Sequence, residues 1–193
     1  MSFDHSIVLF LNGFAGQSAF LDSLIVFFAE YLPDVLIVLF FVFSFRRFTP
    51  FYGRLMLLIE GIGASLLARV FVEVFRLFIH RLRPLVADPN IHGFLIETSY
   101  SFPSGHAAFF FALSTVVYIY DNRWGVWFYA ASLVIGLARV AAGAHYPTDI
   151  LGGALLGVAV GWCVHRFFRR LRSQTSAQSI KETTPASQTR HPL

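Results

Sequence analysis

The chain has 193 residues, of which 56% are hydrophobic, 17% aromatic and only 13% charged, and its mean hydropathy is +0.63. Soluble domains carry about 25% charged residues, so this composition excludes an ordinary soluble protein and predicts one integral membrane domain. The net charge of +4 does not indicate a nucleic-acid partner, because the arginines lie at the ends of apolar segments and not along a solvated basic stripe. The single cysteine, Cys163, excludes a disulfide within the chain and a thiolate metal site.

Five apolar stretches are long enough, or nearly so, to cross a hydrocarbon core about 30 Å thick, which takes about 20 helical residues. In chain order they cover residues 31–45, 55–79, 104–120, 125–142 and 148–168. The first stretch is short, and Pro33 suits the first turn of a helix. We therefore expect residues 20–30 to form a separate interfacial helix, with a sixth, half-inserted segment as the alternative.

We predict an all-α fold, an integral membrane helical bundle with five to six membrane-associated helices. An N-terminal interfacial segment covers residues 1–30 and the transmembrane domain covers residues 31–170. Residues 171–193 are rich in Ser, Thr, Gln and Pro and have few apolar side chains. This composition predicts a disordered cytoplasmic tail, because it cannot bury enough surface to fold.

Arginines in the loops predict the orientation of the bundle. Alternating crossings place four loop arginines on one face of the membrane: Arg46, Arg47, Arg54 and Arg123. The arginines after the last span fall on the same face. Loops rich in Lys and Arg mark the cytoplasmic face. The same alternation brings residues 76–84, 101–106 and 139–149 together on the outer (periplasmic or extracellular) face of an inner (plasma) membrane that the chain crosses several times.

Residues 101–106 read Ser-Phe-Pro-Ser-Gly-His and directly precede an apolar span. Pro103 halts any preceding helix, and Ser104 is a favourable N-cap residue. The backbone N–H groups of Ser104, Gly105 and His106 then point out of a helix N-terminus, which favours a bound phosphate. The alternative is an ordinary helix cap followed by a structural histidine.

In the third stretch, His145 and Asp149 are four residues apart across Pro147. This spacing fits a histidine just before a helix and a carboxylate in its first turn. Asp149 can then accept a hydrogen bond from one imidazole nitrogen and leave the other nitrogen free to attack. The alternative is a capping aspartate beside an interfacial histidine.

Arg76 and Arg83 are seven residues apart, so about two helical turns bring them to one face. Guanidinium groups suit a doubly charged phosphoryl group. The alternative is that these side chains reach lipid headgroups, and for Arg81 we adopt that interpretation. Arg69 and Glu73 have the spacing of a structural ion pair.

A metal site requires clustered histidine and carboxylate ligands. The polar set on the outer face is instead dominated by arginines, whose positive charge disfavours a bound cation. We therefore predict a site that uses no metal and no other cofactor.

Together the three stretches resemble the type 2 phosphatidic acid phosphatase superfamily, whose motifs read K-x6-RP, PSGH and SR-x5-H-x3-D. The corresponding residues here are Arg76-x6-Arg83-Pro84, Pro103-Ser104-Gly105-His106 and Arg139-x5-His145-x3-Asp149. The resemblance covers residues 55–168. Two positions depart from the pattern: Arg76 replaces the lysine and Ala138 replaces the serine before Arg139.

The resemblance implies a role for each matched residue. His145 would be the nucleophile that forms a phosphohistidine, with Asp149 orienting it, and His106 would protonate the leaving oxygen. The remaining matched groups would stabilise the charge of the phosphoryl oxygens: Arg76, Arg83, Arg139, Ser104 and the backbone of Gly105.

The small size, the short loop at residues 85–102 and the outer-face site resemble bacterial undecaprenyl-pyrophosphate phosphatases of the bacitracin-resistance type. The expected partners are accordingly a lipid bilayer and a lipid phosphate substrate, first of all undecaprenyl pyrophosphate. Phosphatidylglycerophosphate, phosphatidic acid and lipid A phosphates are alternative substrates. A vanadium-dependent haloperoxidase and a non-catalytic membrane scaffold are alternatives from other functional classes.

Overall fold

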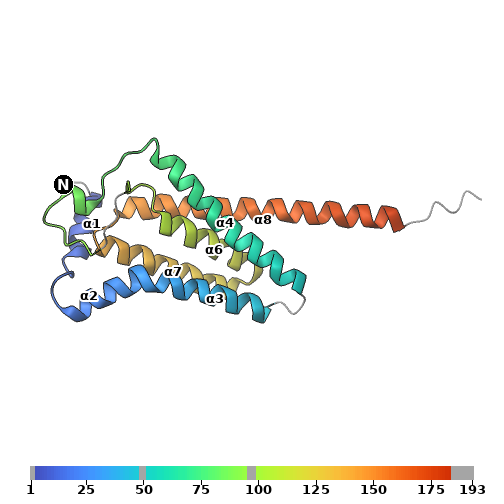
Figure 1. Cartoon of the computed structure of the whole chain (residues 1–193), viewed down its shortest axis with the longest axis horizontal. Helices are drawn as coiled ribbons and strands as arrows, with labels where there is room; N and C mark the ends of the chain where they lie inside the picture. The colour runs from blue at the N-terminus through green and yellow to red at the C-terminus, as the bar shows by residue number, and fades with distance from the viewer. Residues whose placement is uncertain (1–2, 48–50, 95–98, 184–193) are drawn as a thin grey trace, which may run out of the picture.

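The computed structural model describes residues 3–47, 51–94 and 99–183, with side chains described to residue 174. Within these ranges every regular element is helical and none is a strand (Figure 1). Four helical segments are long and apolar enough to cross a membrane, and a fifth helix is apolar but shorter: Ala19–Arg47, Phe51–Arg76, Asn122–Ala141 and Pro147–Gln174, with Gly105–Tyr120 as the shorter one. The predicted all-α membrane helical bundle is confirmed.

The central helix is α6 (Gly105–Tyr120), which packs against α4 (Phe51–Arg76), α7 (Asn122–Ala141) and α8 (Pro147–Thr183), as Figure 1 shows. Its 16 residues span about 24 Å, less than the hydrocarbon core. Most of these residues are buried, and so is Ser104 directly before the helix. The N-terminus of α6 therefore lies inside the bundle and not at its surface.

Glycines on α8 allow its close approach to α6. Three of them, four residues apart, face backbone oxygens of α6 and its N-cap: Gly153, Gly157 and Gly161. A Cβ atom at Gly157 would lie 2.3 Å from the carbonyl oxygen of Ala108. Small residues at such spacing are a common means of packing helices in membranes, where the bilayer provides no hydrophobic drive for association.

The N-terminal part of the bundle differs from the prediction. Helix α2 (Ala19–Val26), the π-helical turn η1 (Phe27–Tyr31) and α3 (Leu32–Arg47) follow one another without a break, so residues 20–30 do not form a separate helix. In η1 the N–H of Leu32 donates to the carbonyl of Phe27, five residues earlier. This wider turn carries the chain past Pro33, which has no N–H to donate to the preceding turn.

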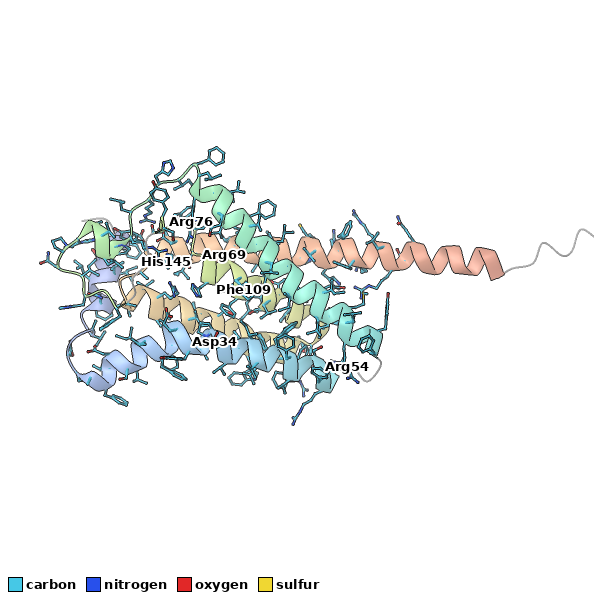
Figure 2. All side chains as sticks on the ribbon, viewed as in Figure 1. Asp34, Arg54, Arg69, Arg76, Phe109 and His145 are labelled. Atoms are coloured by element: carbon cyan, nitrogen blue, oxygen red, sulfur yellow. The ribbon has the colours of Figure 1, made fainter. Side chains whose placement is uncertain are left out.

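The bundle has two chemically distinct ends. Helices α4 and α7 end, and α6 and α8 begin, at the end that holds α1 (Phe3–Asn12) and the short α5 (Pro84–Ala87), as Figure 1 shows. Figure 2 shows Arg54 at the opposite end. The three polar stretches therefore converge, as the number of crossings predicted.

A buried carboxylate fastens α4 to α8 toward the Arg54 end. Glu60 is fully buried and accepts a hydrogen bond from Arg172 at 2.6 Å. Its other oxygen lies 3.0 Å from Nδ1 of His165. Arg172 also donates to the hydroxyl of Tyr120 at the end of α6. The sequence offered no partner for Glu60, because these residues are far apart along the chain.

Helix α8 continues to Thr183, past residue 170, where the sequence predicted the start of a disordered tail. The apolar signal ends near that point, but Arg, Gln, Ala and Lys still favour a helix. A helix that begins inside the bundle can therefore continue without burying apolar surface. The rest of the predicted tail, residues 184–193, lies outside the described residues.

The glycine contacts generate a stability prediction. We expect Gly157→Val to lower the melting temperature in detergent, because the new side chain must push α8 away from the carbonyl of Ala108. Overpacking of this kind costs about 1–3 kcal/mol. The matched control is Gly63→Val on α4, since a Cβ there meets nothing within 4 Å. Equal losses in both variants would contradict the proposed packing role.

Candidate functional site

The structure brings the predicted site residues from four chain segments to the end of the bundle near α1. Arg83, Arg139, His145 and Asp149 are each no more than 1% exposed, although all four carry polar or ionisable groups. Figure 2 shows Arg76 and His145 at this end. Burial of so many polar groups is costly unless each is paired, so their contacts define the site.

His145 lies between a cation and a carboxylate. Its Nε2 is 3.2 Å from Nη1 of Arg83, and its Nδ1 is 3.6 Å from Oδ2 of Asp149. A guanidinium can only donate, so Nε2 must be the acceptor and the imidazole proton belongs on Nδ1, facing Asp149. The lone pair on Nε2 thus points toward the arginine side of the site.

Electrostatics keep this imidazole neutral. Burial lowers the pKa of His145 well below its ordinary value, and the charges of Arg139 and Arg83 lower it further. Burial also lowers the pKa of Arg83 to about 10, with Asp149 opposing this shift, so Arg83 remains charged at neutral pH. A neutral imidazole beside a charged guanidinium is suited to act as a nucleophile toward an anion.

Asp149 occupies the first turn of α8, as the sequence predicted. Its Oδ2 accepts a hydrogen bond from the backbone N–H of Tyr146 at 2.8 Å, and its Oδ1 accepts one from Arg81 at 2.7 Å. The 3.6 Å separation from His145 is longer than a hydrogen bond. The carboxylate therefore faces the buried Nδ1 without a hydrogen bond between them.

Arg81 is part of this arrangement, and the prediction that it only reaches lipid headgroups is wrong. Its guanidinium carbon lies 3.9 Å from the centre of the Tyr146 ring, and it forms ion pairs with both Asp149 and Asp4. Asp4 also accepts hydrogen bonds from the backbone N–H and the hydroxyl of Thr148. Arg81 therefore connects Asp4 on α1 to the site carboxylate Asp149.

A serine that the sequence did not single out links the first two predicted arginines. Arg83 donates from Nε to the carbonyl of Ser99 at 2.8 Å and from Nη2 to its hydroxyl at 3.0 Å. Arg76 donates to the same hydroxyl at 3.4 Å. Ser99 belongs to no recognisable motif, so only the folded loop indicates its role. Among the described residues, Nε of Arg76 is buried without a hydrogen-bond acceptor and can donate to a ligand.

Arg139 reaches the site from the last turn of α7. Its Nη1 lies 3.5 Å from the carbonyl of Ala29 and 3.6 Å from the carboxylate of Glu30. Pro33 has no N–H to donate to Ala29, four residues earlier, so this carbonyl is available to the arginine. The N-terminal segment, which the sequence placed at the membrane interface, thus holds one of the three predicted arginines.

The N-terminus of α6 lies beside these groups. Ser104 caps the helix by accepting a hydrogen bond from the N–H of Ala107, and its own N–H donates to the carbonyl of Asp149 at 3.0 Å. His106 and Gly105 line a cavity of about 340 Å³ between α3, α4 and α6. Figure 2 shows Asp34, Arg69 and Phe109, which line the same cavity from the three helices.

These contacts describe a site for an anion. Three guanidinium groups and a helix N-terminus supply positive charge, and a neutral imidazole lies against one of the arginines, whose N–H its Nε2 accepts. In the part of the chain that the structure describes, no group of three or more His, Cys, Asp or Glu side chains could hold a metal ion.

Comparisons with known proteins match residues 54–173 to the PAP2 superfamily. Phosphatidylglycerophosphatase B of Bacillus subtilis (strain 168) is 30% identical over 152 residues, which cover 73% of this chain and 69% of that protein. Undecaprenyl-diphosphatase BcrC of the same organism is 26% identical over 171 residues, or 88% and 86% of the two chains. The crystal structure of Aquifex aeolicus LpxE has a similar fold, with a TM-score of 0.71 at 23% identity over 86% of this chain and 96% of that chain.

The contacts of Asp4 generate a prediction about pH. Burial alone would raise the pKa of Asp4, but hydrogen bonds from Thr148 and Arg81 lower it below its ordinary value. A carboxyl with a lowered pKa stabilises the fold above its unfolded pKa of about 3.9, and this stabilisation is lost as the pH falls through the folded value. At pH 7 we expect Asp4→Asn to melt at a lower temperature than wild type in detergent.

The difference in melting temperature between wild type and Asp4→Asn should shrink below about pH 4, because a protonated aspartate resembles asparagine. Measuring both proteins from pH 7 to pH 3 cancels the contributions of other titrating groups. A difference that stays constant over this range would show that the charge of Asp4 does not hold Arg81 and Thr148 in place.

Proposed function

This chain belongs to the PAP2 superfamily and is a PAP2-type membrane lipid phosphatase, and we propose that it hydrolyses undecaprenyl pyrophosphate to undecaprenyl phosphate through a phosphohistidine. The observation that carries the proposal is the position of His145, with Nε2 against Arg83 and Nδ1 facing Asp149. This geometry leaves a nucleophilic lone pair directed to the place where a phosphoryl group would meet the arginines.

Binding and attack follow from these contacts. The terminal phosphoryl group takes the hydrogen bonds of Arg76, Arg83 and Arg139, and a phosphoryl oxygen replaces Nε2 of His145 as the acceptor for Arg83. Nε2 then bonds to phosphorus while the bond from phosphorus to the bridging oxygen breaks. Asp149 stabilises the charge that develops on the imidazole.

His106 completes both halves of the reaction. It donates a proton to the bridging oxygen, which leaves with the lipid, and afterwards it takes a proton from the water that attacks the phosphohistidine. Inorganic phosphate is released and His145 returns to its neutral form. The N–H groups at the start of α6 assist the arginines in stabilising the phosphoryl oxygens.

The proposed mechanism uses no metal, because fixed guanidinium groups supply the positive charge that a metal ion would otherwise provide. The proposed location is an inner (plasma) membrane, with the site on the outer side and α8 ending in the cytoplasm. Support comes from the loop arginines, such as Arg46, Arg47 and Arg123, which lie at the opposite end of the bundle from His145.

The two relatives support different lipids. The undecaprenyl-diphosphatase matches this chain over the larger share of both proteins, which is why we place undecaprenyl pyrophosphate first. The phosphatidylglycerophosphatase has the higher identity, so phosphatidylglycerophosphate is the second candidate substrate. Both reactions transfer a terminal phosphoryl group to the same nucleophile.

The nucleophile assignment predicts the effect of one substitution. We expect His145→Ala to reduce phosphate release from lipid substrates at least about 10³-fold, since the loss of a nucleophile removes most of the chemical acceleration. The melting temperature in detergent should stay close to that of wild type. With substrate labelled with ³²P in the terminal phosphate and a quench in alkaline SDS, wild type should carry a base-stable label that acid removes, and His145→Ala should carry none.

The control for this experiment is His92→Ala, which removes an exposed imidazole while leaving the backbone contacts of that residue in place. Its turnover should match wild type. Substantial activity or label in folded His145→Ala protein would assign the nucleophile to another residue.

The substrate is tested with a panel of lipid phosphates in detergent, with and without EDTA. We expect the highest kcat/KM for undecaprenyl pyrophosphate, lower values for phosphatidylglycerophosphate, phosphatidic acid and lipid A, and no loss of activity with EDTA. A preference for phosphatidylglycerophosphate would replace the first substrate by the second. Strong inhibition by EDTA that added Mg²⁺ reverses would contradict metal independence.

A further inference from the structure

Arg69 is a further guanidinium group at the site, outside the three matched motifs. It lies on α4 seven residues before Arg76, so about two helical turns place both side chains on one face. Figure 2 shows Arg69 between Arg76 and Phe109, on the side of α4 that faces α6. The sequence predicted only an ion pair with Glu73, and this pair is confirmed at 3.2 Å.

The guanidinium of Arg69 lies against the N-terminus of α6. A Cβ atom at Gly105 would be 1.4 Å from Nη1 of Arg69, so any residue other than glycine would displace this side chain. Arg69 is therefore next to the helix N-terminus that the mechanism uses for phosphate, and next in space to His106.

Arg69 and His106 line the same cavity of about 340 Å³. The other walls of this cavity are largely apolar side chains of α3, α4 and α6, including Ile37, Leu66 and Phe109. Asp34 also lines it, from the α3 side. A cavity with an arginine and a histidine on one wall and apolar side chains on the others suits the place where a charged headgroup joins a lipid tail.

Glu73 shows that Arg69 and Arg76 can share one anionic oxygen. Its Oε1 lies 3.2 Å from Arg69 and 3.1 Å from Arg76. The Glu73 side chain is 52% exposed, so it can turn away without leaving a buried carboxylate unpaired. A phosphate oxygen has the charge and the acceptor geometry to take its place.

We propose that Arg69 is a specificity-determining residue that binds the phosphate remaining on the lipid, and that it makes this enzyme prefer lipid diphosphates over lipid monophosphates. The inference rests on the proposed function. His106 protonates the oxygen that leaves with the lipid, so the leaving group must lie beside His106, where Arg69 also lies. A diphosphate has a second phosphate at this place, whereas a monophosphate has only an alcohol oxygen.

The chemistry of the leaving group limits the effect of Arg69 to diphosphate substrates. When the bond from phosphorus to the bridging oxygen breaks, its electron pair stays on that oxygen, which takes the proton of His106 and leaves on the lipid-linked phosphate. Arg69 binds the negative charge that the lipid-linked phosphate already carries. A monophosphate ester leaves as a neutral alcohol once His106 has given its proton, so Arg69 has no second phosphate to bind.

The test compares two substrates with the same polyprenyl tail, one a diphosphate and one a monophosphate, by phosphate release in detergent. We expect Arg69→Gln to lower kcat/KM for the diphosphate about 10- to 100-fold, the range for loss of a charge-assisted hydrogen bond. The value for the monophosphate should change less than about threefold by the same reasoning. Arg69→Gln should also weaken inhibition by inorganic pyrophosphate more than inhibition by inorganic phosphate.

Two further variants separate substrate binding from a structural role. Glu73→Gln breaks the same ion pair, so it should keep the diphosphate preference if Arg69 binds substrate, and lose it if Arg69 acts only through Glu73. Arg54→Gln removes an arginine at the other end of α4, over the ring of Phe45, and should leave both substrates unaffected.

Equal losses on the two substrates, or no loss on either, in a variant with the wild-type melting temperature would overturn the role of Arg69 and leave the phosphatase assignment intact. A wild-type protein that hydrolyses no lipid phosphate would instead overturn the proposed function, and this inference with it.

Discussion

Burial of three guanidinium groups at one end of a membrane bundle is the constraint around which this structure is arranged. Arg76, Arg83 and Arg139 are at most 5% exposed, and charged groups withdrawn from water need partners of good geometry. Arg83 donates hydrogen bonds to Ser99 and to the carbonyl of Ala144. Arg139 donates one to the carbonyl of Ala29. The loops and the N-terminal helical segment at this end are held by these contacts.

The same constraint determines the chemistry. Because Arg83 can only donate, it leaves Nε2 of His145 as an acceptor. Burial lowers the pKa of His145, and the surrounding positive charge lowers it further, so the imidazole is neutral. Asp149 balances this charge on the other side of the ring, and Arg81 links it to Asp4. An anion is the ligand that such a site favours, since it meets fixed positive charge and an unprotonated nitrogen at once.

The packing of α6 determines how far the site lies below the surface of the bundle. Its glycine contacts with α8 and its shortness place the N-terminus of the helix inside the bundle, between the arginines and an apolar cavity. The arginine side chains are therefore withdrawn from bulk water, and the cavity beside them is lined largely by apolar side chains. At the other end, Glu60 and Arg172 fasten α4 to α8, so the helices that form the site are joined at both ends.

The sequence by itself determined the fold class and the approximate spans, and it singled out the eight candidate site residues, because hydropathy and motif spacing are local properties of the chain. Pairings between distant residues were decided only by the tertiary structure: Asp4 and Thr148 are 144 residues apart, and Ser99 has no motif that would mark it. The same is true of Arg69, whose nearness to Gly105 depends on how α4 crosses α6. Residues 20–30 were misplaced for a related reason, since the π-helical turn that carries the chain past Pro33 has no signature in composition.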